Sequence, residues 1–179
     1  ELGKPATVGS RRFVIGSQEE IEGGWLREVT LESATLAFVL ATPEDNVVAG
    51  ASEKLLILRA RLRNPEKTSN FNVSTSTAIG LRMWQRYTGT GKFQFVSHYD
   101  AETLRPFTRN LRSGESVRFV SVWRVPADFN DFRLGITTST ATIIPWYDLR
   151  EQIGKLQTVF AAPDGITALP SANVDLGKP

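Results

Sequence analysis

The sequence predicts an all-β protein whose antiparallel strands pack as a sandwich or a barrel. Apolar and polar residues alternate along most of the chain, as they do in strands that bury one face. Clusters of Gly, Pro, Asn and Asp separate the alternating segments, and such clusters form turns. About seven to nine short strands follow from these two patterns, at the spacing typical of an antiparallel sandwich.

The first forty-one residues are predicted to contain two strand regions. Residues 10–16 (SRRFVIG) predict a strand. The acidic, glycine-rich residues after them do not fit a twin-arginine export signal, which needs an apolar run. Residues 25–41 predict one long strand or a bent pair of strands, in which Leu36, Phe38 and Leu40 line one face.

The clearest strand covers residues 54–64 (KLLILRARLRN). Its alternate positions form an apolar face and a face with three arginines, which is typical of a half-buried strand. The apolar face comprises Leu56, Leu58, Ala60 and Leu62, and the opposite face comprises Ile57, Arg59, Arg61 and Arg63. The Asn-Pro pair at residues 64–65 predicts a turn directly after this strand, because proline presets φ for a turn.

Residues 71–99 are predicted to form an edge strand and then a hairpin. The edge strand covers residues 71–78, which are rich in Thr, Ser and Val. Two further strands, residues 79–87 and 92–99, are joined by the glycine-rich turn at residues 89–91.

Residues 113–126 (SGESVRFVSVWRVP) predict a strand with a strongly apolar face. Phe119 and Trp123 belong to this face and are expected in the core, and Pro126 ends the strand. Residues 132–136 alternate again and predict a further strand.

Residues 138–179 are predicted to form an extension that packs on the same domain as residues 1–137. Apolar side chains recur at helical spacing in residues 148–160, and Asp148 is suited to an N-cap, so a short helix is expected here. The tetrapeptide LGKP occurs at both ends of the sequence. It is either a reused turn or the trace of a tandem array.

Two stretches have a recognisable order of strand and turn residues: LLILRARLRNPEKTSNFNV (residues 55–73) and LRSGESVRFVSVWRVPADFNDFRLGI (residues 111–136). With the start GKPATVGSRRFVI, they resemble the immunoglobulin-like β-sandwich domains of unknown function found in secreted bacterial proteins and lipoproteins. The resemblance covers roughly residues 2–137. It implies an antiparallel immunoglobulin-like sandwich in a secreted or periplasmic, non-enzymatic module, and it brings no catalytic residues.

The composition argues against several classes of function. The net charge is +2 and no long run of like charges occurs, which argues against nucleic acid as a partner. The absence of cysteine excludes disulfides, thiolate metal sites and cysteine nucleophiles. His98 is the single histidine, and with Asp100 it is either half of an acid–base pair or a locally hydrogen-bonded side chain. No nucleophile motif accompanies His98. We therefore expect that the protein is not an enzyme and that it binds no cofactor and no metal ion.

Exposed aromatic residues are the best candidates for binding. Trp84 is predicted on an outward face between Arg82 and Arg86, with Tyr87 adjacent, and this group could stack against a sugar or a base. The alternative is that the arginine stems cover Trp84 against the protein. Trp146 and Tyr147 could line the same groove or pin the C-terminal extension to the sandwich.

These observations favour a non-catalytic, exported module that mediates protein–protein or cell-surface contacts. The alternative is a carbohydrate-binding module, in which exposed aromatic residues bind a polysaccharide. No segment has the roughly 20 apolar residues that a transmembrane helix needs. The oligomeric state and the ligand do not follow from the sequence.

Overall fold

The computed structural model describes residues 2–9, 12–13, 20–21, 26–73, 79–83, 93–137, 144–151 and 153–161. All regular structure within these residues is β, as the alternation predicts, and they contain no helix. The strands are β1 (Pro5–Gly9), β2 (Arg12–Phe13), β3 (Glu20–Ile21), β4 (Leu26–Leu40), β5 (Val47–Val48), β6 (Glu53–Arg63), β7 (Phe71–Val73), β8 (Gly80–Met83), β9 (Gln94–Asp100), β10 (Arg109–Leu111), β11 (Ser116–Pro126), β12 (Arg133–Thr137), β13 (Trp146–Asp148) and β14 (Gln157–Phe160).

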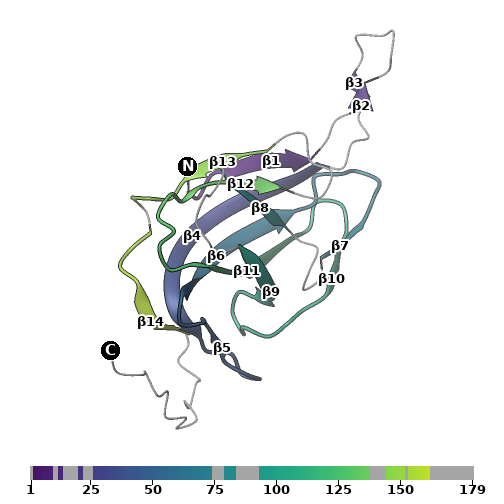
Figure 1. Cartoon of the computed structure of the whole chain (residues 1–179). Helices are drawn as coiled ribbons and strands as arrows, with labels where there is room; N and C mark the ends of the chain where they lie inside the picture. Colours follow the sequence, from purple (N-terminus) through teal and green to yellow (C-terminus); the bar gives the residue numbers. More distant parts are fainter. Residues whose placement is uncertain are drawn as a thin grey trace.

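A seven-stranded sheet forms the centre of the protein (Figure 1). Its strands follow the order β1-β4-β6-β11-β9, and β5 and β14 both pair with the far end of β4. Every pairing in this sheet is antiparallel except that of β14 with β4, which is parallel. Three smaller sheets accompany it: β8-β12-β13, β7-β10 and β2-β3.

The main core, called here the first core, lies on one face of the central sheet. Alternate residues of β6 enter it, as the sequence predicts, because Leu56, Leu58, Ala60 and Leu62 are all buried in this cluster. Residues of β7, β10, β12 and β13 belong to the same cluster, so the sheets β7-β10 and β8-β12-β13 cover this face of the central sheet. Phe119 is fully buried here, and Trp123 packs against the cluster from a partly buried position.

A second core occupies part of the opposite face. It contains Leu55, Ile57, Val120 and Val122 from β6 and β11, together with Leu104 from the loop after β9. The rest of this face is polar and carries the arginines of β6. Both faces at the centre of the sheet are therefore buried, which explains why Leu55 to Leu58 are buried without alternation.

A β-bulge in β4 changes which residues face the first core. The pairing with β6 shifts between Leu31 and Ser33, so Glu32 is an extra residue in the strand. Leu31 and Ala34 consequently face the same core although they are three positions apart. The predicted common face of Leu36, Phe38 and Leu40 is not observed, because Phe38 is 43% exposed while the other two are buried in different cores.

The helix predicted for residues 148–160 is wrong. Asp148 ends β13, and β14 begins at Gln157 and extends the edge of β4. Between the two strands, the N–H of Ile153 donates to the carbonyl of Leu149 at 2.8 Å. Strand pairing with β4 takes the place of the helical hydrogen bonds, and Gly154 disfavours a helix here.

The hairpin predicted from residues 79–99 is also not formed in the described residues. β8 pairs with β12 in the three-stranded sheet, whereas β9 pairs with β11 in the central sheet. The two strands thus lie in different sheets. β13 and β14, from the predicted extension, pair with β12 and β4. The boundary predicted at residue 137 stays a prediction.

Candidate functional site

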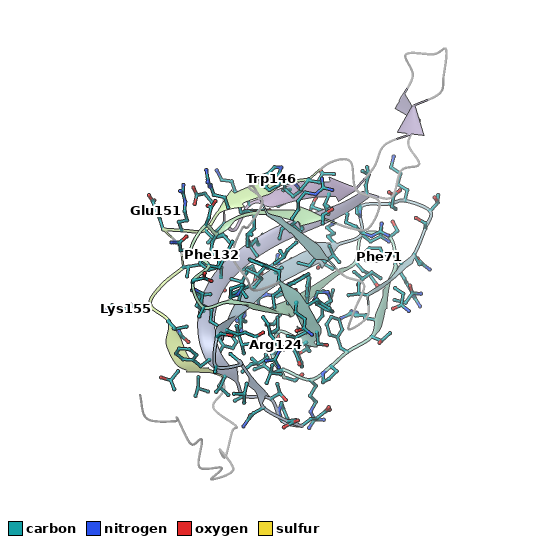
Figure 2. The ribbon with its side chains drawn as sticks, in the orientation of Figure 1. Phe71, Arg124, Phe132, Trp146, Glu151 and Lys155 are labelled. Atoms are coloured by element: carbon teal, nitrogen blue, oxygen red, sulfur yellow. The ribbon has the colours of Figure 1, made fainter. Side chains whose placement is uncertain are left out.

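The residues predicted to bind a ligand are only partly described. Trp84, Arg86 and Tyr87 lie outside the described residues. Arg82 is exposed on β8, Trp146 is 39% exposed on β13, and Tyr147 is buried. Figure 2 shows the Trp146 side chain at the margin of the molecule, beside β13.

Strand register brings Arg82 and Trp146 together. Gly135 of β12 pairs with Arg82 on one side and with Trp146 on the other, so the three residues form one row across the small sheet. Residues paired across neighbouring strands point to the same face. Tyr147 and its partner Leu134 belong to the opposite face, which is part of the first core.

Gly135 allows Trp146 to lie close to the sheet. A Cβ atom at this position would come within 2.7 Å of Cγ2 of Ile144 and within 3.2 Å of two atoms of the indole ring. The indole therefore covers the glycine backbone, an arrangement that shields a glycine in a sheet from solvent. One part of the ring has this structural role, and the other part stays exposed.

Two ion pairs lie next to the row of Gly135 and Trp146 in the small sheet. Arg133 donates two hydrogen bonds to Asp131, at 2.7 and 2.8 Å, and Arg150 binds Asp148 in the same bidentate manner. The Arg150 guanidinium lowers the pKa of Asp148 to about 2. Arg133 and Asp148 are register partners, so the two pairs adjoin and their charges balance.

The surface formed by these residues is called here the Trp146 face: Arg82, Arg133, Gly135, Trp146 and Asp148. It contains a shallow cleft of about 240 Å³, lined by Arg133, Trp146, Tyr147 and Asp148. The hydroxyl of Tyr147 is buried and has no hydrogen-bond partner among the described residues. The face offers an apolar ring between groups that both donate and accept hydrogen bonds.

His98 is a core residue in this structure. It is fully buried between the rings of Phe95 and Phe119, with centroid distances of 4.7 and 5.2 Å. Its Nε2 accepts a long hydrogen bond, 3.4 Å, from the N–H of Ile79, and its Nδ1 has no partner among the described residues. Burial lowers the pKa of His98 to about 4. Asp100 instead accepts hydrogen bonds from Glu102 and Thr103 in its own loop.

The described part of the chain has neither a metal-binding cluster nor a membrane-spanning helix. No group of three or more His, Cys, Asp or Glu residues there is placed to hold a metal ion. None of its segments is a helix long and apolar enough to cross a membrane.

Comparison of the chain with models of protein families, with curated proteins and with solved structures gives no match. The function is therefore inferred from the residues of this chain alone.

Proposed function

We propose that this chain is a non-catalytic binding module that contacts a protein or a cell-surface component through the Trp146 face. The observation that supports this proposal is the fixed and exposed indole of Trp146, which lies over Gly135 in one row with Arg82. The proposal includes an immunoglobulin-like sandwich architecture and export from the cell, both of which rest on the sequence resemblance.

An exposed indole is a favourable contact because covering it removes apolar area from water. A tryptophan side chain that is 39% exposed presents about 100 Å² of surface. At about 25 cal/mol per Å², covering this area contributes about 2–3 kcal/mol to binding. The ring is already held in place, so little conformational entropy is lost when a ligand covers it.

A polysaccharide is the second candidate ligand, and the groups beside Trp146 favour it. Sugar rings stack on exposed indoles through their apolar faces, while their hydroxyl groups need donors and acceptors nearby. The paired Arg133 and Asp148 side chains provide both. Because the two ion pairs are balanced in charge, a neutral ligand meets no net repulsion or attraction from them.

The experiment is retention of ligands by the immobilised chain, from an envelope extract of the source cells and from a panel of polysaccharides. Arg82→Ala and Trp146→Ala are compared with the wild type, and Val48→Ala serves as a control because Val48 is also exposed but lies on β5. We expect both variants on the Trp146 face to lose about 90% of the retained ligand or more, which corresponds to about 1.4 kcal/mol.

Arg82→Ala distinguishes loss of the binding surface from loss of the fold, which Trp146→Ala could also cause. Arg82 has no ion pair with any described residue, so its removal breaks none of the ion pairs among the described residues. Equal retention by the wild type, Arg82→Ala and Trp146→Ala would exclude the Trp146 face as the binding surface. Retention of a purified polysaccharide would decide in favour of the second candidate.

A further inference from the structure

A second cleft lies on the face of the central sheet that points away from the first core. It has a volume of about 350 Å³ and is lined by Arg61, Asp100, Glu102, Arg109, Ser116, Val117 and Arg118. β9 pairs with β11 only from Phe119 onward, so the first residues of β11 extend beyond β9 and form one wall of the cleft. Arg61, Arg109 and Arg118 come from β6, β10 and β11, and this site is called here the arginine cleft.

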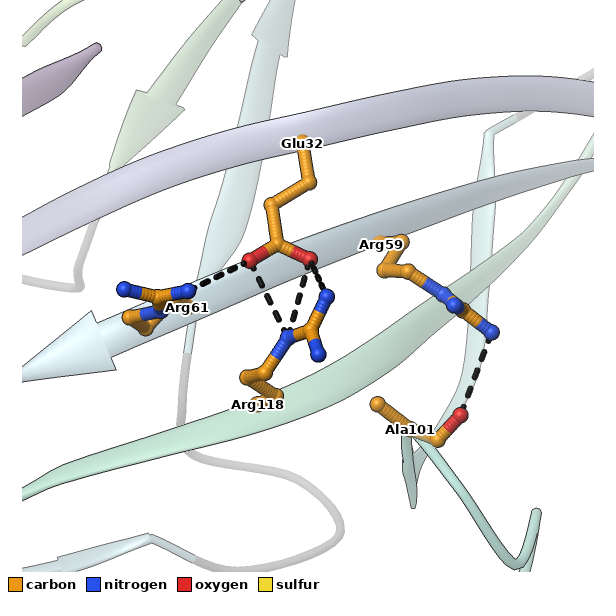
Figure 3. Close-up of polar contacts among 5 residues, drawn as sticks. All are labelled: Glu32, Arg59, Arg61, Ala101 and Arg118. Carbon is orange, nitrogen blue, oxygen red and sulfur yellow. Dashed lines mark hydrogen bonds and ion pairs between the residues drawn. The ribbon is translucent and has the colours of Figure 1, made fainter. Parts of the chain in front are cut away.

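Glu32 holds two of these arginines in fixed orientations (Figure 3). Arg118 donates through Nε and Nη2 to the Glu32 carboxylate, with a shortest distance of 2.8 Å, and Arg61 donates to the same carboxylate at 3.3 Å. The Glu32 side chain is only 16% exposed, whereas those of Arg61 and Arg118 are about half exposed. The bulge in β4 therefore places a carboxylate beneath two guanidinium groups whose remaining N–H groups face solvent.

The loop after β9 forms a rigid second wall. Asp100 Oδ1 accepts from the N–H groups of Glu102 and Thr103, at 3.0 and 2.8 Å, and Arg59 donates to the carbonyl of Ala101 at 3.2 Å. Leu104 adopts φ = 52°, an unusual conformation for leucine, and its side chain is buried in the second core. A conformation of this kind persists only where the surroundings determine it, so the loop is held in a single shape.

The charges in the cleft leave guanidinium groups available. Glu32 neutralises Arg118, and the donors of its own loop solvate Asp100. Arg109 has no ion pair with any described residue, and Arg61 makes only the 3.3 Å contact with Glu32. Neither of the two lining carboxylates, Asp100 and Glu102, forms an ion pair with a described residue, and Glu102 lacks the hydrogen bonds that Asp100 accepts within its loop.

We propose that the arginine cleft binds a small organic acid that carries two or more carboxylate groups. Guanidinium groups bind carboxylates in a bidentate manner, as Arg118 already does with Glu32. Arg61 and Arg109 come from different strands, and the N–H groups of Arg118 that do not bind Glu32 lie in the same cleft, so the site matches a ligand with several carboxylates better than a single anion. A volume of about 350 Å³ is at the lower end of the range of small-molecule sites. This proposal is independent of the Trp146 face.

The test is an NMR titration of the full chain with citrate, a tricarboxylate, at a constant ionic strength of about 0.15 M, so that non-specific attraction is screened. Acetate and inorganic sulfate are titrated in parallel as a monocarboxylate and a different oxyanion. We expect citrate to shift the resonances of Arg109, Ser116 and Arg118 and to bind at least tenfold more tightly than acetate or sulfate.

Two exposed residues give variants with opposite expected effects. Arg109→Gln should weaken citrate binding at least fivefold, and Glu102→Gln should strengthen it because a repelling charge is removed. Arg112→Gln is the matched control, since Arg112 is exposed nearby but does not line the cleft. The proposal is overturned if Arg112→Gln weakens binding as much as Arg109→Gln, if Glu102→Gln weakens binding, or if acetate and sulfate bind as tightly as citrate.

Discussion

The buried His98 should make the stability of the protein depend on pH between about 4 and 6.5. In the folded state, burial lowers its pKa from 6.5 to about 4. No charged group is among the causes of this shift, and the imidazole's one polar contact with the described residues is the N–H of Ile79, which is itself a donor. Protonated imidazole has two donors and no acceptor, so the His98–Ile79 hydrogen bond is incompatible with the charged form.

The sign and size of the effect follow from proton linkage. Between pH 6.5 and 4 the unfolded chain binds a proton at His98 and the folded chain does not, so the free energy of unfolding falls as the pH falls. One pKa unit corresponds to about 1.4 kcal/mol, so the full loss is about 3 kcal/mol. About 2 kcal/mol of it should appear between pH 7 and pH 5. The favourable effect of the Asp148 pKa, about 2, is lost only below the usual aspartate pKa of 3.8.

The assay is urea unfolding at pH 7, 6 and 5, followed by tryptophan fluorescence, for the wild type and His98→Gln. Glutamine keeps an acceptor for the N–H of Ile79 but does not titrate. Between pH 7 and pH 5, the free energy of unfolding of His98→Gln should therefore change by about 2 kcal/mol less than that of the wild type. His98 is the only histidine, so its imidazole resonance also reports its pKa directly. Parallel pH profiles for the two proteins, or an imidazole that titrates near pH 6.5, would refute the reasoning.

Three substitutions test the packing around the Trp146 face and the core. Gly135→Ala should destabilise the fold by about 1–3 kcal/mol and alter tryptophan fluorescence, because the added Cβ meets Ile144 and the indole; unchanged stability in urea would show that the indole does not lie over Gly135. Tyr147→Phe should leave the melting temperature unchanged or raise it, since the buried hydroxyl has no partner among the described residues, and a clear fall would reveal one. Asn64→Ala should cost about 2–4 kcal/mol in urea unfolding, because the buried Asn64 side chain makes three hydrogen bonds to backbone atoms of Glu66, Ser69 and Leu111; a loss below 1 kcal/mol would contradict their role.

The strands of the central sheet were predictable because their two faces differ in polarity. In β6, the alternation placed the side chains of Leu56, Leu58, Ala60 and Leu62 in the core. It placed the three arginines, Arg59, Arg61 and Arg63, on the other face. Both assignments agree with the structure. The bulge at Glu32 was not predictable, because the alternation changes phase within residues 32–35 (ESAT), whose small and polar side chains do not show which face is buried. The helical spacing in residues 148–160 misled the prediction, because pairing with the edge of β4 determines this segment and depends on contacts distant in sequence.

The candidate site was predictable only in its residue types. The stacking surface predicted around Trp84 lies outside the described residues and stays a prediction, whereas Arg82 and Trp146, which belong to the same group of candidates, lie in one row. Their proximity depends on the register of β8, β12 and β13, which local patterns do not determine. Gly135 was not recognised, although a glycine inside a strand often marks the close approach of another group. The arginine cleft was also missed, because Arg109 and Glu102 come from loops and short strands that show no periodicity.

The most direct test of the Trp146 face is the behaviour of its indole N–H resonance when a retained ligand is added to the full chain. Trp123 is an internal control, because its indole N–H donates to the hydroxyl of Ser121 at 2.8 Å and its ring packs against the first core. We predict that the Trp146 resonance shifts in a saturable manner while that of Trp123 does not. Saturable ligand binding that leaves the Trp146 resonance unchanged would contradict the proposed binding surface.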